Sequence, residues 1–380
     1  MKKKIVILAL HMGYGGVENS IATKASLLCN TFDVEIISLY RQTIDIPYNI
    51  DKRVKVTYLM NTISNREEFK DCVKHLNVIG IIKEGLKALS ILLVKNKNIR
   101  NYIMQSNADV IISTRYEFTK ILNKYGKNII KIHEQHVYNV SKKYINKLGR
   151  FANIDYIMPV SKYIYDEYKK YLDRNKLYFI PLPLNYYPSN NEKSDLDSKN
   201  LIAVGRLDKI KGFDDLIKVM KIVVEHDNSV KLNIFGDGQC KEELNALLNK
   251  YNLNNNIKLW GFKEPNFIKK YYTNSTLYAM VSHEESFGLV VLESLSFGVP
   301  CIAFDDAKGC LDIIKDSGGV IIENRNINLM ALKILEYLNK SKGEKKELGL
   351  KAQSIINNYK LDVIKKSWKE FLDSILDNGE

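Results

Sequence analysis

The sequence predicts an α/β protein made of two doubly wound, Rossmann-like parallel-sheet domains that face a cleft. Its 380 residues exceed what one hydrophobic core usually serves, which favours two domains. Short runs rich in Val and Ile alternate with amphipathic segments of helix length along the chain. Such strands are typical of parallel sheets covered by helices on both faces, in which ligands bind beyond the carboxyl ends of the strands.

The first domain is expected to comprise residues 1–185. Its strands are expected at residues 5–10, 34–39, 54–58, 110–113, 129–133, 156–160 and 177–182. Helical spacing of apolar residues separates these strands, for example in residues 20–29 and 163–171. Residues 81–95 predict a further amphipathic helix with lysines on its polar side, which either packs against a core or lies on an anionic membrane surface.

A linker is expected at residues 186–200, which are rich in Asn, Ser and Asp. The second domain then covers residues 201–357, with strands expected at residues 201–204, 231–235, 257–260, 277–281, 301–304 and 320–322. Its C-terminal part is helical without strands. The last segment, residues 358–380, carries an apolar stripe and is expected to return to the first domain.

The composition limits the class of protein. A charged fraction of 27% with 10% aromatic residues excludes a disordered chain or a coiled-coil rod. The five cysteines are an odd number at no metal-ligand spacing, which indicates reduced thiols and no metal site. The apolar run at residues 5–10 is too short for a secretory signal, and no stretch approaches the roughly 20 apolar residues of a spanning helix. We therefore expect a cytoplasmic protein.

Positive charge is concentrated in the first half of the chain. Residues 1–190 hold 30 Lys and Arg against 16 Asp and Glu, whereas residues 191–380 hold 27 against 28. This asymmetry predicts that the first half faces a polyanion or an anionic membrane, with peripheral contact at the inner face of the cell membrane. Nucleic acid fits the charge equally well, so the motifs must decide.

The first motif is a glycine turn, Gly13-Tyr14-Gly15-Gly16, between the first strand and a helix. Glycines there let backbone approach a ligand, and the helix N-terminus favours an anion. Glu18 stands near the place of the third glycine of the dinucleotide fingerprint, which disfavours a dehydrogenase. A tight turn without a ligand explains this motif equally well.

The second motif follows the first strand of the second domain, where Arg206 and Lys211 flank a turn that opens a helix near Gly212. Arginine offers a fork of donors to phosphate oxygens and lysine a point charge, so the two together can neutralise a diphosphate without a metal. A solvated loop is the alternative for these cations.

The third motif begins where the strand at residues 277–281 ends. Ser286 is a candidate N-cap for a helix that runs to about residue 297, with Glu285 just before it and Glu293 two turns inside it. The free amides of residues 287–289 then form an anion site between two acceptors, a layout that suits the sugar, diphosphate and ribose of a nucleotide sugar. Alternatively, Glu285 interacts with the helix dipole and Glu293 lies on the helix surface.

In this combination the chain resembles the retaining glycosyltransferases of family 4, also called glycosyl transferases group 1, of the bacterial cell-surface polysaccharide type. The matching pieces are the Gly15-Gly16 turn, Arg206 with Lys211, Gly236-Asp237-Gly238 after a strand, Glu285 with Glu293, and Gly298-Val299-Pro300. They occur in the family's order over nearly the whole chain. The resemblance implies the two-domain GT-B architecture, with the acceptor on the first domain and the nucleotide sugar on the second.

The resemblance also implies residue roles. Nucleotide-sugar contacts fall to Gly15, Gly16, Arg206, Lys211, Gly236, Phe262, Lys263, Phe287, Gly288, Leu289 and Glu293, and catalytic roles to Glu285, His133, Arg206 and Lys211. Glu293 would bind the ribose, and Glu285 would contact the sugar. His136 competes with His133 for the active-site position. The chain departs from the family's pattern at Ser286, where glycine is usual, and at residues 181–185, which replace a commoner asparagine–glycine turn.

The implied activity is the metal-independent, retaining transfer of a hexose or N-acetylhexosamine from a nucleoside diphosphate sugar, by preference a UDP-sugar, to a glycan or lipid-linked acceptor. No cofactor besides the donor is implied. The aspartate pairs at positions 195/197, 214/215 and 305/306 are expected to be solvated. Two alternatives stay open: a non-hydrolysing nucleotide-sugar epimerase, and a basic nucleic-acid-binding protein. The latter is disfavoured because no basic motif interleaved with aromatic residues is present.

Overall fold

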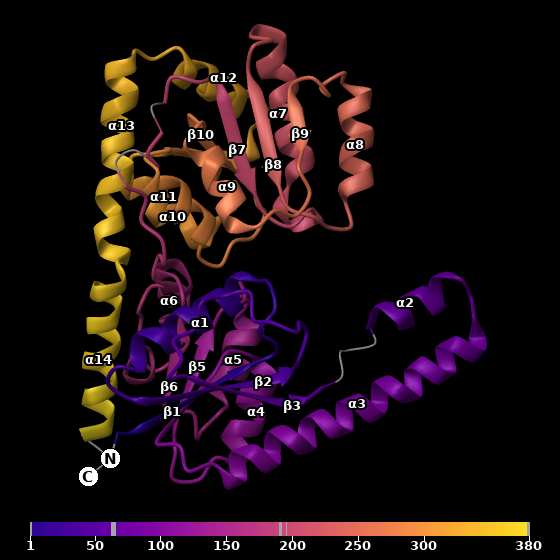
Figure 1. Ribbon diagram of the computed structural model, residues 1–380, viewed down its shortest axis with the longest axis vertical. Coiled ribbons are helices and arrows are strands. Elements are labelled where there is room, and N and C mark those ends of the chain that lie inside the picture. The colour runs from indigo at the N-terminus through magenta and orange to yellow at the C-terminus, as the bar shows by residue number, and fades with distance from the viewer. Residues whose placement is uncertain (1, 62–65, 190–191, 195, 378–380) are drawn as a thin grey trace. The chain divides into compact units, whose positions relative to one another are not determined.

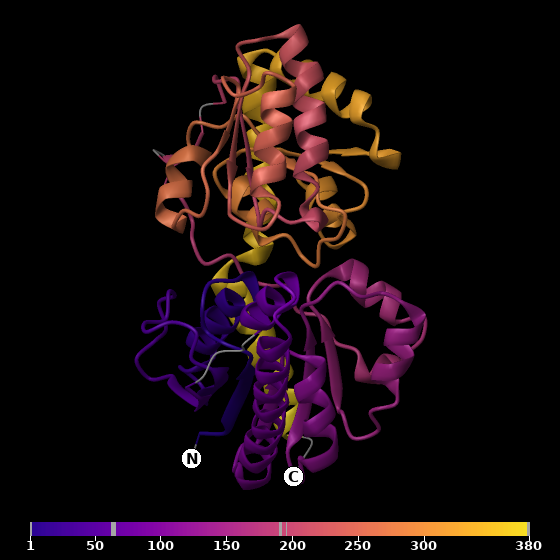
Figure 2. The ribbon, with the colours of Figure 1, turned by 90° about the vertical axis from the view of Figure 1, so that its right-hand side faces the viewer.

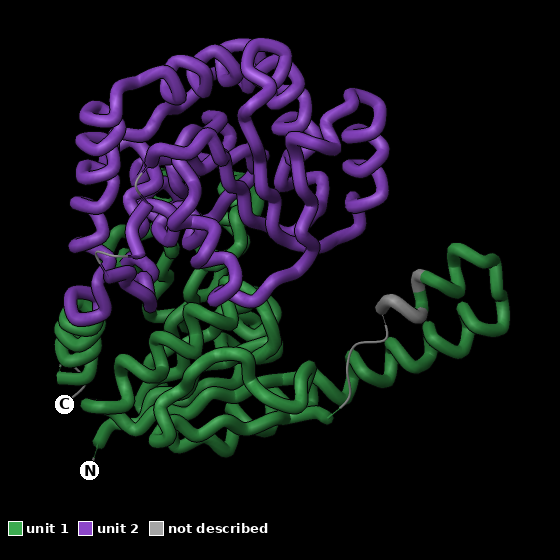
Figure 3. Tube along the Cα trace, turned by 45° about the horizontal axis from the view of Figure 1, so that its top comes forward, with its two compact units in different colours: residues 1–160, 165–180, 365–380 green, residues 161–164, 181–364 purple. Residues whose placement is uncertain are grey.

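The computed structural model describes residues 2–61, 66–189, 192–194 and 196–377. The chain divides into two compact units (Figure 3). Residues 1–160, 165–180 and 365–380 form the first unit, and residues 161–164 and 181–364 form the second. The main division therefore falls at residue 180, five residues ahead of the expected end of the first domain, and the final segment belongs to the first unit.

The first unit is built on a six-stranded parallel sheet with the strand order β3-β2-β1-β4-β5-β6. Its strands are β1 (Lys4–Ala9), β2 (Asp33–Tyr40), β3 (Lys55–Met60), β4 (Val110–Ser113), β5 (Ile130–Gln135) and β6 (Tyr156–Pro159). In the middle of the sheet, Ile7 of β1 pairs with Ile36 of β2 on one side and Ile112 of β4 on the other. The strand order reverses at β1 and β4, and doubly wound sheets bind their ligands beyond such a switch point.

The prediction of a seventh strand in this half, at residues 177–182, is wrong. Leu177 makes only an isolated bridge with Ile157. Pro181 and Pro183 have no backbone N–H to donate, so a ladder cannot continue through them.

Helices complete the first unit: α1 (Gly16–Leu28), α2 (Arg66–Lys74), α3 (Val78–Gln105), α4 (Tyr116–Tyr125), α5 (Lys142–Gly149) and the last part of α14 (Leu361–Asp377). Helix α6 (Lys162–Tyr168) spans the division between the units. Helices α2 and α3 form a hairpin that projects from the sheet (Figure 1). Helix α3 joins the core through the buried Ile99 and Ile103, and its partly buried Ile91 and Tyr102 pack against the same core.

The apolar stripe of α14 is buried in the first unit. Phe371 contacts Tyr178, with 4.3 Å between ring centroids, and meets Tyr156 edge-on at 5.2 Å. Trp368 is 2% exposed, and its ring lies 4.6 Å from the Lys24 ammonium of α1. The last helix therefore contributes to the core of a unit whose other elements end at residue 180.

The second unit repeats the architecture with the strand order β12-β11-β10-β7-β8-β9, again with every pair parallel. The strands are β7 (Asn200–Val204), β8 (Lys231–Phe235), β9 (Ile257–Leu259), β10 (Leu277–Met280), β11 (Cys301–Phe304) and β12 (Val320–Ile322). The helices are α7 (Phe213–His226), α8 (Lys241–Lys250), α9 (Pro265–Tyr272), α10 (Leu289–Ser296), α11 (Leu311–Asp316), α12 (Ile327–Leu338) and α13 (Lys342–Ser354).

Helices lie on both faces of this second sheet (Figure 2). Helix α7 packs with α8 and α12, whereas α10 packs with α11 and α13. The prediction of two doubly wound parallel sheets is confirmed. Within the described residues, no helix is long and apolar enough to cross a membrane.

Candidate functional site

The carboxyl edge of the second sheet is formed by glycine loops that bond to one another. After β7, the Gly205 amide donates to the carbonyl of Phe235 at 2.9 Å, and after β8 the Gly236 amide donates to Gly261 at 3.0 Å. Gly236 has a φ of 136°, and a Cβ there would lie 1.8 Å from the carbonyl oxygen of Gly205. Only glycine fits this position, so the predicted donor-site Gly236 is also required by the packing of the loops.

The turn from Arg206 to Lys211 is organised by Asp208, whose carboxylate accepts from the Lys211 amide at 3.3 Å and begins a 3-10 turn. The Lys211 ammonium then lies 2.8 Å from Oε2 of Glu285 on the loop after β10. The structure therefore brings together two of the predicted catalytic side chains. Arg206 instead pairs with Asp208 at 2.9 Å, and its side chain is 78% exposed.

The loop between β10 and α10 differs from the prediction at its N-cap. Helix α10 begins at Leu289 with Gly288 as N-cap, so the prediction that Ser286 caps the helix is wrong. Gly288 adopts a left-handed φ of 85°, and a Cβ there would lie 2.7 Å from Cys310. This glycine lets the chain turn sharply into the helix, which therefore starts two residues later than the sequence pattern predicted.

This later start changes which backbone amides precede the helix. The Ser286 amide is taken by Oε1 of Glu285 at 3.1 Å. Within the described chain, no protein acceptor lies within hydrogen-bond reach of the amides of Phe287, Gly288 and Leu289. Amides at a helix N-terminus that lack protein partners favour an anion.

Gly309 contacts the backbone of Glu285, and the sequence analysis did not identify it. Its amide donates to the Glu285 carbonyl at 3.1 Å, and a Cβ at Gly309 would lie 2.2 Å from the same oxygen. The available signal was a glycine shortly after the strand at residues 301–304, on the same sheet edge as the other glycine loops.

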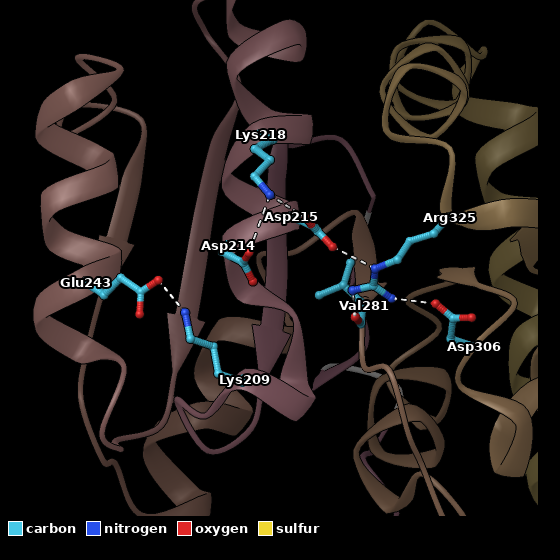
Figure 4. Close-up of polar contacts among 8 residues, drawn as sticks. All are labelled: Lys209, Asp214, Asp215, Lys218, Glu243, Val281, Asp306 and Arg325. Carbon is cyan, nitrogen blue, oxygen red and sulfur yellow. Dashed lines mark hydrogen bonds and ion pairs between the residues drawn. The ribbon is translucent and has the colours of Figure 1, made fainter.

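Arg325 is a second residue that the sequence reasoning missed (Figure 4). Its guanidinium donates to Asp215 at 2.6 Å, to Asp306 at 2.9 Å and to the carbonyl of Val281 at 2.7 Å. The interpretation of these aspartate pairs as solvated is therefore wrong for Asp215, whose side chain is 15% exposed, whereas the paired Asp306 is still 37% exposed. No local pattern relates Arg325 to Asp215, because 110 residues separate them.

The Arg325 cluster fixes two loops of the candidate site. Burial alone would raise the pKa of Asp215, but hydrogen bonds from Lys218 and Arg325 outweigh it and hold that pKa below its usual range. Gly212, which follows Lys211, has a φ of 65°, and a Cβ there would lie 2.2 Å from Arg325 and 2.3 Å from the Val281 carbonyl. Arg325 thus lies against both the Lys211 turn and the end of β10.

Glu293 lies on α10, partly buried, with its carboxyl group against the Tyr272 hydroxyl and near the Lys269 ammonium. Burial raises the pKa of Glu293 to about 7, against the smaller opposing effects of Lys269 and Tyr272. A carboxyl with this pKa is partly protonated at neutral pH, so its acceptor strength changes within the physiological range.

The predicted base-binding residues follow β9. Phe262 is half exposed, and the Lys263 ammonium lies 5.3 Å from the centre of the Phe267 ring. Just before them, Trp260 stacks on Phe235 with 5.8 Å between centroids, and its indole N–H donates to Asn233 at 2.8 Å. This aromatic packing anchors the start of the loop that carries Phe262.

In the first unit, the glycine turn after β1 is held by Tyr48. The Tyr48 hydroxyl accepts from the Gly15 amide at 2.6 Å and donates to the Gly15 carbonyl at 2.8 Å. A Cβ at Gly15 would lie 2.0 Å from the carboxylate of Glu18, whereas one at Gly16 would have no neighbour within 4 Å. A side chain at Gly15 would therefore displace the Glu18 carboxylate, whereas the packing of the chain leaves Gly16 unexplained.

His133 is buried at the end of β5, with both ring nitrogens occupied. Nδ1 lies 2.7 Å from the Thr119 hydroxyl and Nε2 lies 2.7 Å from Oε1 of Gln135. Burial lowers the pKa of His133 to about 4, so the ring is neutral at pH 7. His136, the competing candidate, is also buried, with Nε2 2.8 Å from Glu134. Glu134 additionally pairs with Lys24 of α1.

Comparisons with known proteins define the class. Residues 189–355 match the model of the family described as glycosyl transferases group 1. An uncharacterized glycosyltransferase of Haemophilus influenzae is 24% identical over 385 residues, which cover 97% of this chain and 100% of that protein. The poly(ribitol-phosphate) alpha-N-acetylglucosaminyltransferase of Staphylococcus aureus is 32% identical over 193 residues, which cover 50% of this chain and 38% of that protein.

A solved structure covers nearly the whole chain. A mutant of S. aureus TarM in complex with Fondaparinux, alpha-GlcNAc-glycerol and UDP has a TM-score of 0.74 at 19% identity, covering 97% of this chain and 99% of that chain. The protein is a glycosyltransferase with the GT-B fold. Its residues 189–355, somewhat under half of the chain, resemble the glycosyl transferases group 1 family. The chain spans the full length of the H. influenzae relative but little more than a third of the S. aureus transferase.

Proposed function

We propose that this glycosyltransferase moves a hexose or N-acetylhexosamine from a UDP-sugar to a glycan or lipid-linked acceptor in cell-surface polysaccharide biosynthesis, with retention of configuration and without a metal ion. The observation that carries the proposal is the Lys211–Glu285 pair, 2.8 Å apart, beside the amides of residues 287–289 at the start of α10. The UDP in the TarM complex and the acceptor named for the S. aureus relative support the donor and acceptor classes.

The chemistry follows from where charge develops. When the bond between the sugar and the diphosphate breaks, negative charge grows on the β-phosphate. The Lys211 ammonium, the Arg206 guanidinium and the amides of residues 287–289 are the groups that would stabilise it. These donors supply the positive charge for which many transferases use a divalent metal. The acceptor hydroxyl would attack the face from which the diphosphate departs, which retains the configuration.

Two side chains would orient the donor. When the phosphate binds the Lys211 ammonium, Glu285 would lose this ion pair and would accept hydrogen bonds from sugar hydroxyls. Glu293 would accept hydrogen bonds from the ribose. Gly236, Phe262 and Lys263 would line the rest of the nucleotide-sugar site, and Gly15 and Gly16 would contribute contacts from the first unit. His133 remains a proposed catalytic residue that must change its hydrogen bonds with Thr119 or Gln135 before it can contact a substrate.

In this proposal, the basic half of the chain binds the acceptor and contacts the membrane. Residues 1–190 carry the whole positive excess of the chain, which suits an anionic acceptor or leaflet. We propose a cytoplasmic protein with peripheral contact at the inner face of the cell membrane. A nucleotide-sugar epimerase would instead release isomerised sugar without any acceptor, so product analysis separates the two functions.

The test compares turnover in substituted proteins. Lys211→Ala and Glu285→Ala should each lower the release of UDP in the presence of acceptor about 100-fold or more while the fold is kept. Lys209→Ala and Glu284→Ala, at exposed neighbours of the same two loops, are the matched controls and should stay near the wild-type rate. Turnover at the wild-type rate in either test variant would remove the proposed site.

A further inference from the structure

The α2–α3 hairpin presents an apolar stripe that no described residue of the first unit covers. Helix α3 uses its other face for contacts with α2, where Gly85 lies near Phe69 and Gly80 lies near Cys72. The stripe, which we call the α3 seam, consists of Ile79, Ile82, Leu86, Leu89 and Leu93, each between 53% and 82% exposed. The alternative that this helix packs against a core is therefore wrong for the five residues of the α3 seam, whereas Ile91, on another face of α3, does pack against the core.

The seam has the spacing of a coiled coil. Its members follow one another at alternating intervals of three and four residues, which places Ile79, Leu86 and Leu93 at heptad position a and Ile82 and Leu89 at position d. The g positions widen this exposed apolar face, because Val78 is 66% and Leu92 47% exposed, and the a/d residues are the knobs that fit the holes of a second helix. The seam also contains no aromatic anchor of the kind that membrane-surface helices use.

We propose that α3 pairs with α3 of a second copy of this chain, in parallel and in register, through the α3 seam. The repeat is complementary to itself, so an identical helix supplies the required holes. The inference stands on the hairpin alone and does not depend on the proposed reaction.

The charges beside the seam select the parallel direction. Lys83 and Lys97 occupy the e positions, whereas the g positions hold Val78, Gly85 and Leu92. In a parallel pair each g position faces an e position of the partner, so the lysine stems lie along Val78 and Leu92 of the other copy. An antiparallel pair would bring e to e and g to g, and would therefore take the lysine stems away from Val78 and Leu92.

Sedimentation of the full chain tests the proposal. We expect a dimer of twice 43.8 kDa at micromolar concentration. The double variant Leu86→Gln, Leu89→Gln should raise the dimer dissociation constant more than about 100-fold, because it removes two buried leucines from each helix. The matched control is Leu332→Gln, Leu350→Gln, two exposed leucines on α12 and α13, and it should remain dimeric.

Disulfide trapping tests the direction. In a Cys72→Ser background, Leu89→Cys should form a cross-linked dimer on mild oxidation, whereas Ser90→Cys, one residue off the seam, should not. The other four cysteines are buried. A monomeric wild-type chain would overturn the proposal, as would a double variant that remains dimeric. Loss of binding to anionic vesicles in the double variant, with a monomeric wild type, would assign the seam to the membrane instead.

Discussion

Replacing Glu293 by glutamine should stabilise the second unit at alkaline pH and weaken donor binding. The raised pKa, about 7 against an ordinary 4.5, means that ionised Glu293 opposes folding. This penalty on the free energy of unfolding is small below pH 4.5, grows between pH 4.5 and pH 7, and is nearly constant at higher pH. Carried through linkage, it reaches at most about 3 kcal/mol at pH 8 and less than about 1 kcal/mol at pH 5.

Because part of the Glu293 side chain stays in contact with solvent, we expect about half of these values. A gain of about 1.5 kcal/mol corresponds to a rise in melting temperature of about 4 °C at pH 8, against about 1 °C at pH 5. Scanning calorimetry of both proteins at the two pH values measures this difference. Glu284→Gln, an exposed neighbour on the preceding loop, is the control and should show no such gain.

The same variant tests the proposed ribose contact. Glutamine keeps one acceptor oxygen but replaces the other with a donor, so the affinity for UDP should fall about tenfold in calorimetry at pH 8. If the stability gain were equal at pH 5 and pH 8, Glu293 would not carry the charge penalty described above. If UDP affinity were unchanged, Glu293 would not bind the ribose.

Three further substitutions probe the supports of the site and of the first unit. Arg325→Met leaves Asp215 and Asp306 without their shared cation and should cost roughly 2 kcal/mol at pH 7; since the Asp215 pKa is lowered in the folded state, the loss should shrink only as the pH falls below the ordinary aspartate value of 3.8, and chemical unfolding at pH 7 and about pH 3 measures it. Gly236→Ala forces a Cβ against the Gly205 carbonyl, so it should lower both the melting temperature and UDP affinity, and unchanged calorimetric values would show that the glycine loops can relax. Trp368→Ala should cost about 3–5 kcal/mol of stability by denaturant titration, because it empties a buried site beside Lys24 and Phe371; a loss below 1 kcal/mol would show that α14 is not part of that core.

The sheets were predictable because their strands are buried on both faces. The two runs Ile5–Ala9 and Cys301–Phe304 lie inside continuous apolar sequence, and a buried parallel strand needs little else. Segments that depend on backbone conformation were less predictable. Ser286 has good N-cap chemistry, but the left-handed turn at Gly288 decides where α10 starts.

Contacts between distant segments were not predictable from local pattern. The Lys211–Glu285 ion pair joins residues 74 positions apart, and the sequence suggested it only through the resemblance to a family. Arg325 has no partner close in the chain, so nothing in its neighbourhood distinguishes it from other surface arginines. For the α3 seam, the sequence shows the apolar periodicity but not whether other parts of the chain cover it.

The place of α14 bears on how the polypeptide matures at the ribosome. The hydrophobic site for Trp368 and Phe371 is made by residues translated early, whereas these two side chains are translated only after residues 181–364. Until then the nascent first unit has no α14 to cover Lys24 and Tyr178. A fragment ending at residue 180 would lack that closing helix, and a synthetic peptide of residues 361–377 supplied in trans should restore its solubility.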